Sequence, residues 1–87
     1  MDKIEKKLLR KFYMHNVWGK HHFREDTLLK GFPSHLRYRV KIAAEELRRS
    51  GYLIKFPTGH GMQWYANIKK LKEIEEIVMS NNDTLNE

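Results

Sequence analysis

The stretch ELRRSGYLIKFPTGHGMQWYAN, residues 46–67, joins the end of a predicted helix to two predicted strands. Gly51 is a helix stop signal, because glycine readily adopts the left-handed backbone that ends many helices. Two short, aromatic, β-prone segments follow at residues 52–56 and 62–66. The segment between them, residues 57–61, contains a proline and two glycines, as hairpin loops often do. The stretch therefore predicts a β-hairpin attached directly to a helix end.

The helix before the hairpin is predicted over residues 34–50, with Ser34 as a good N-cap. At 100° per residue its apolar side chains fall within one arc, which we expect to face the core. These side chains are Leu36, Val40, Ala43, Ala44 and Leu47. The first half of the opposite surface is basic and aromatic.

Apolar residues at helical spacing predict two further helices, at residues 2–15 and 68–80, with Asn67 capping the second. Residues 24–30 predict a short helix, because acids occupy its first turn and Gly31 follows it. The three residues 31–33 then fit the tight corner of a helix-turn-helix. Residues 18–23 predict an extended segment or a first short strand. In the last helix, we expect Leu71, Ile74, Ile77 and Val78 to face inward.

The chain is 87 residues long, which suits one domain with one core, predicted over residues 1–79 and followed by a disordered tail, residues 80–87. It carries 17 Lys and Arg against 11 Asp and Glu, a net charge of +6 that favours polyanionic partners. Cysteine is absent and no apolar run approaches a membrane span. We therefore expect a cytoplasmic protein that does not contact membranes.

These elements resemble the winged-helix family of DNA-binding domains, and small archaeal proteins of that kind. The resemblance covers residues 1–79 and is carried by the corner KGFPS (residues 30–34), by AAEELRRSGYLI (residues 43–54) and by the hairpin. It implies an α+β winged helix-turn-helix: a three-helix core, a C-terminal β-hairpin wing and an additional C-terminal helix. It further implies that the third helix enters the major groove of DNA and that the wing lies on the backbone.

The predicted nucleic-acid contacts lie on two elements. The start of the third helix offers free backbone N–H groups and a favourable dipole to phosphate, and the glycines of the hairpin tip let the backbone approach closely. The predicted contacts are Ser34, His35, Arg37, Tyr38, Arg39 and Lys41 on the helix, and Lys55, Thr58, Gly59, His60 and Gly61 on the hairpin. Two plainer interpretations stay open. The cations could form a solvated surface paired with Glu45 and Glu46, and the tip glycines could serve only the turn.

Catalysis and metal binding find no support in the sequence. The five histidines lack metal-ligand spacing, and no carboxylate pair, nucleophile triad or phosphate loop is present. We expect neither enzymatic activity nor a cofactor.

The leading hypothesis is sequence-specific binding of double-stranded DNA in transcriptional regulation. One alternative is a protein-interaction module that uses Tyr38, Ile42 or the last helix. Another is an RNA-binding winged helix. The oligomeric state is open, and a homodimer would form through the C-terminal helix.

Overall fold

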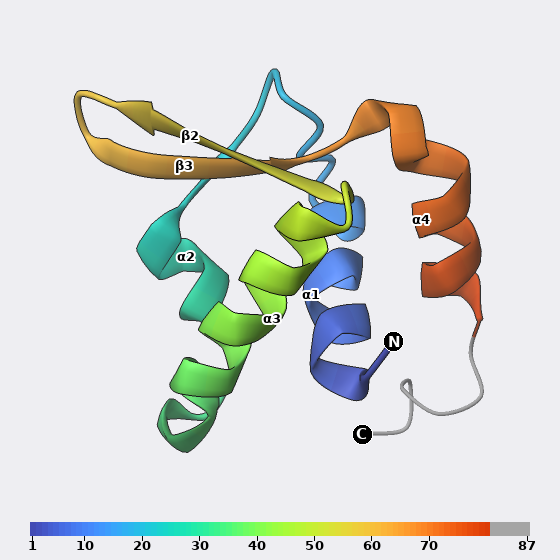
Figure 1. The fold of residues 1–87 in the computed structure, drawn as a ribbon, viewed down its shortest axis with the longest axis horizontal. Helices are drawn as coiled ribbons and strands as arrows, with labels where there is room; N and C mark the ends of the chain where they lie inside the picture. The colour runs from blue at the N-terminus through green and yellow to red at the C-terminus, as the bar shows by residue number, and fades with distance from the viewer. Residues whose placement is uncertain (81–87) are drawn as a thin grey trace.

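The computed structural model describes residues 1–80, which form an α+β fold with a three-stranded antiparallel sheet (Figure 1). The helices are α1 (Lys3–Met14), α2 (Glu25–Leu29), α3 (Arg37–Arg49) and α4 (Leu71–Met79), and the strands are β1 (Phe23–Arg24), β2 (Leu53–Thr58) and β3 (Gly61–Ala66). Two 3₁₀ turns, η1 (Ser34–Leu36) and η2 (Ile68–Lys70), precede α3 and α4. The predicted tail lies, apart from Ser80, outside the described residues.

The core forms around α1, which lies between α3 and α4 (Figure 1). Leu8, Leu9 and Phe12 of α1 are fully buried, because their spacing places them on one side of the helix. Asp2 and Glu5 start this helix with reciprocal side-chain to backbone hydrogen bonds, a capping box. The sequence-predicted helix is thus confirmed.

The sheet has the strand order β1-β3-β2, so β3 is central. Phe23 lies opposite Trp64, and Leu53 lies opposite Ala66. Because side chains alternate along a strand, Leu53, Trp64 and Ala66 all point to the core side, where each is buried. The extended segment predicted at residues 18–23 contributes only Phe23 to this sheet.

The hairpin loop is shorter than predicted. β2 and β3 continue to Thr58 and Gly61, so the loop is Gly59 and His60 rather than residues 57–61. The Thr58 hydroxyl donates to the Gly61 carbonyl at 2.8 Å and accepts the His60 N–H at 3.0 Å. Gly61 has φ +105°, which glycine adopts without strain. Pro57 is tolerated because β2 is an edge strand.

The starts of the last two helices differ from the sequence prediction. Ser34 makes no capping hydrogen bond; it opens the 3₁₀ turn η1, and α3 begins at Arg37. Asn67 does cap, since its side chain accepts the Lys69 N–H at 3.0 Å. Ile74 and Val78 are buried as predicted, whereas Leu71, the first residue of α4, is 39% exposed.

A lysine joins α1 to the end of α2. The Lys11 ammonium donates to the Thr27 carbonyl and, at 2.7 Å, to the Lys30 carbonyl. It also lies 5.6 Å from the centre of the Phe23 ring. Burial, with a smaller contribution from the charge of Lys30, lowers the pKa of Lys11 below its usual value. Lys11 therefore adds a charged donor at the C-terminal end of α2, where the Thr27 carbonyl also accepts the Lys30 N–H.

Leu47 is 2% exposed on the core side of α3, and its truncation should leave a cavity. We expect Leu47→Ala to lower the free energy of unfolding by about 2–5 kcal/mol in a denaturant titration. Ile42→Ala, at a 47% exposed position of the same helix, is the control and should change it by less than about 1 kcal/mol. Equal effects would mean that the two sides of α3 are wrongly assigned.

Lys11→Met keeps the aliphatic stem but removes both hydrogen bonds to α2. We expect a loss of about 1–3 kcal/mol in the free energy of unfolding, because two carbonyls lose a charged donor. Lys72→Met, at an exposed position of α4, tests the same exchange away from α2. Urea titrations of both variants should separate them, and similar curves would contradict the role given to Lys11.

Candidate nucleic-acid interface

The outward surface of α3 is where the sequence predicts it. Tyr38 is 74% exposed and Ile42, one turn later, is 47% exposed. Val40, Ala43 and Ala44 on the other side of the helix are buried. The predicted apolar arc is therefore confirmed except at Leu36, which is only partly buried. Ser34 and His35 are exposed in η1, just ahead of the helix.

Three cations near the start of α3 have no ion-pair partner within residues 1–80. These are Arg37, Arg39 and Lys41, all of them exposed. The two acids of α3 pair elsewhere: Glu45 lies 2.9 Å from Arg48 and 2.8 Å from Lys55, and Glu46 lies 3.5 Å from Arg49. The plainer interpretation, in which these acids neutralise the three cations, is therefore wrong. The first half of the helix presents uncompensated positive charge.

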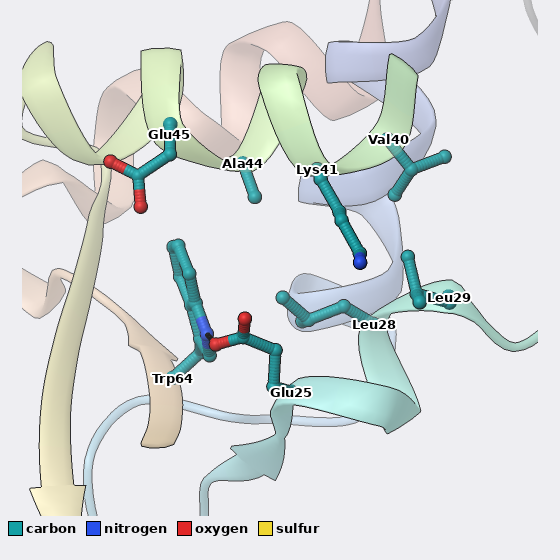
Figure 2. Close-up of a pocket in the computed structure, with 8 residues that line it drawn as sticks. All are labelled: Glu25, Leu28, Leu29, Val40, Lys41, Ala44, Glu45 and Trp64. Carbon is teal, nitrogen blue, oxygen red and sulfur yellow. Dashed lines mark hydrogen bonds between the residues drawn. The ribbon is translucent and has the colours of Figure 1, made fainter. Parts of the chain in front are cut away.

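Lys41 leaves α3 on the flank that faces α2, as Figure 2 shows. It lines a small cavity of about 70 Å³ together with Leu28 and Trp64. The Trp64 indole N–H donates to Glu25 Oε1 at 2.9 Å across this cavity. The space is far below the roughly 300 Å³ of a typical small-molecule site. Lys41 is therefore better placed to act on a partner outside the protein than on a ligand within it.

Lys55 does not project toward solvent as a phosphate contact would require. Its ammonium lies 2.8 Å from Glu45 Oε2 and 5.2 Å from the centre of the Trp64 ring. Alternation along β2 places Lys55 on the same side of the sheet as Leu53, toward α3. The side chain therefore fastens the hairpin to the helix, and Glu45 is shared between Lys55 and Arg48.

At the hairpin tip, the His60 side chain is more available to a partner than the His60 backbone N–H. The His60 N–H is already bonded to Thr58, so it is not free for phosphate, whereas Gly59, His60 and Gly61 are all exposed. A Cβ atom added to Gly59 would meet nothing within 4 Å, and no positive φ holds that residue. The turn itself therefore requires glycine at Gly61, by its backbone angle, and not at Gly59.

The structure also gathers residues that the sequence analysis did not connect. His22, Arg24, His60 and Gln63 surround an open depression on the sheet. Arg24 lies beside Gln63 because β1 pairs with β3 over two residues. A two-residue strand carries no periodicity, so no pattern in the sequence could have indicated this pairing.

Within residues 1–80 no group of three or more His, Asp or Glu side chains is arranged to hold a metal ion. Over the same part of the chain, no helix has the length and apolar character needed to cross a membrane. Comparison of the chain with protein-family models, with curated proteins and with solved structures gave no match.

Hydrogen bonds from Lys55 and then from Arg48 hold the pKa of Glu45 below its usual value. A lowered carboxyl pKa adds stability above the pKa of the unfolded chain, and this stability is lost as the pH falls through the folded pKa. We expect Glu45→Gln to cost up to about 1 kcal/mol at pH 7, since the group is partly exposed. Urea titrations at successively lower pH should show that the difference from the parent protein disappears once the pH lies below the folded pKa of Glu45. A difference that persists in acid would contradict this account.

Proposed function

We propose that this chain is a winged-helix protein that binds double-stranded DNA sequence-specifically in transcriptional regulation. In this proposal α3 lies in the major groove and the β2–β3 hairpin is the wing that lies along the backbone. The observation that carries it is the run of unpaired cations around an exposed tyrosine at the start of α3.

The order of the elements supports the proposal. A helix, a short strand, two helices joined by residues 30–36 and a hairpin follow one another, with β3 between β1 and β2. The corner contains Gly31, whose φ of +89° suits a sharp change of direction. The hairpin runs out from the end of α3 past α2 (Figure 1), so helix and hairpin together offer a wider footprint than the helix alone.

The chemistry of α3 supports the same partner. Arg37, Arg39 and Lys41 can neutralise phosphates or bond to guanine, while Tyr38 and Ile42 offer apolar contact to a thymine methyl group. Both kinds of side chain are exposed within less than two turns of helix. A helix fits the major groove, which is about 12 Å wide.

A protein-interaction module is the second candidate, because Tyr38 and Ile42 are apolar and exposed. Ile68, Leu71 and Met79, along η2 and α4, are also exposed and would be the contact of a homodimer. Salt separates the two candidates, since phosphate contacts weaken steeply with ionic strength and apolar contacts do not. Competition between duplex DNA and structured RNA separates the DNA proposal from the RNA-binding alternative.

Replacing Arg37 and Lys41 together by Ala should weaken binding to mixed-sequence duplex DNA. We expect the slope of log affinity against log salt to become shallower by roughly two, because each cation releases about one counterion. The matched control is Lys69→Ala with Lys72→Ala, which removes the same charge from η2 and α4. Fluorescence anisotropy over a range of salt concentrations measures both.

An unchanged slope in the α3 variant would place the contact elsewhere. An equal loss of affinity in the α3 variant and its control would mean that DNA binding depends only on the net charge of the protein. That result would contradict a role for α3. Salt-independent binding to a protein would favour the interaction module.

A further inference from the structure

The sheet has a second face, directed away from α3. Gln63 lies opposite Phe56 on one neighbouring strand and opposite Arg24 on the other, so these three side chains share a face. Lys55 and Trp64 alternate with them and point the other way, where Lys55 bonds Glu45 of α3. Whatever binds on the Gln63 face is therefore separated from α3 by the sheet.

This face carries the open depression of about 540 Å³ lined by His22, Arg24, His60 and Gln63. None of the four residues is acidic. They come from the segment before β1, from β1, from the hairpin tip and from β3. The side chains thus converge from four parts of the chain.

One histidine of the depression is held in a defined orientation. His22 Nδ1 lies 3.0 Å from Gln63 Oε1, and the ring packs edge-on against Phe56 with the ring centres 5.4 Å apart. A carbonyl oxygen can only accept, so Nδ1 carries the hydrogen and Nε2 is left as the second functional atom. Gln63, which is 4% exposed, anchors this arrangement. Protonation of Nε2 then converts an acceptor into a cationic donor.

The charges around the depression favour an anion. The Arg24 Nε lies 3.9 Å from Asp26 Oδ1, a long contact between two exposed side chains that is weak in water. The neighbouring acid Glu25 is bonded to Trp64. Two of the side chains, His22 and His60, are histidines, the residue type that most often acts as a pH switch near neutral pH. Arg24 is permanently charged and opposes a metal cation here.

We infer that His22, Arg24 and His60 form a phosphate-binding site on the outer face of the sheet, occupied by a backbone phosphate of a nucleic acid and strengthened by protonation of the two histidines. The inference rests on the proposed function, which supplies the nucleic acid. The site lies on a surface distinct from α3. Two of its residues, His22 and Arg24, lie outside the predicted hairpin tip. Arg24 binds at any pH, and the histidines set how tightly the phosphate is held.

The test is an NMR titration of the full chain with mixed-sequence duplex DNA at pH 6 and pH 8, with inorganic phosphate as a second probe. We expect DNA to shift the ring resonances of His22 and His60 and the side-chain amide of Gln63 at pH 6. Affinity for DNA should rise about three- to tenfold from pH 8 to pH 6, with a salt slope steeper by roughly one. Arg24→Gln should weaken binding at both values of pH.

His60→Gln removes one titrating group from an exposed loop and should reduce the pH effect. His35→Gln removes a histidine from the α3 surface instead, and at saturating DNA it should leave the resonance shifts of the depression unchanged. Arg24→Gln repeats the test without touching the Gln63 hydrogen bond, so a folding defect cannot imitate the result.

If Arg24→Gln and His60→Gln bind like the parent while the α3 variant binds weakly, the sheet site is overturned and the proposed function stands. If only His35→Gln removes the pH effect, the titrating contact belongs to α3 and the sheet site is again overturned. Shifts with inorganic phosphate but none with DNA would show an anion site that nucleic acid does not use, which also overturns the inference. Loss of DNA binding in the sheet variants alone would support the site and contradict the role of α3.

Discussion

The fold depends on the burial of one side of α1. Leu8, Leu9 and Phe12 have no exposed surface, and α3, α4 and β3 all pack against this helix. A chain of 87 residues forms a single hydrophobic core. Each helix and strand is therefore positioned by the apolar side chains that it contributes to that core. The polar surface of α3 points outward because the apolar side chains of this helix pack against α1.

Electrostatic pairing then divides α3 into two halves with different roles. The C-terminal half is nearly neutral, because Glu45 and Glu46 are paired with Arg48, Arg49 and Lys55. The N-terminal half keeps its charge. Such a gradient along one helix directs the positive field to the end where the backbone N–H groups also lie, and both favour an anionic partner.

The sequence was informative wherever periodicity or a local signal decided the outcome. The apolar arc of α3, the burial of Ile74 and the cap at Asn67 all follow from spacing or from one side chain acting on its own backbone. The failures have a common cause. Lys55 points inward because its partner Glu45 lies ten residues away in the chain, and Arg24 meets Gln63 through long-range strand pairing. Tertiary contacts of this kind leave no mark on local sequence.

The contacts of Asn67 join several elements at the base of the hairpin. Its backbone N–H bonds the Tyr52 carbonyl at 2.9 Å, and its side-chain amide donates to the Gly51 carbonyl at 2.9 Å while also capping η2. The ends of both strands, the end of α3 and the start of the final helical segment therefore meet at one residue. Asn67 thereby links the position of the last helix, which packs on α1, to the base of the hairpin.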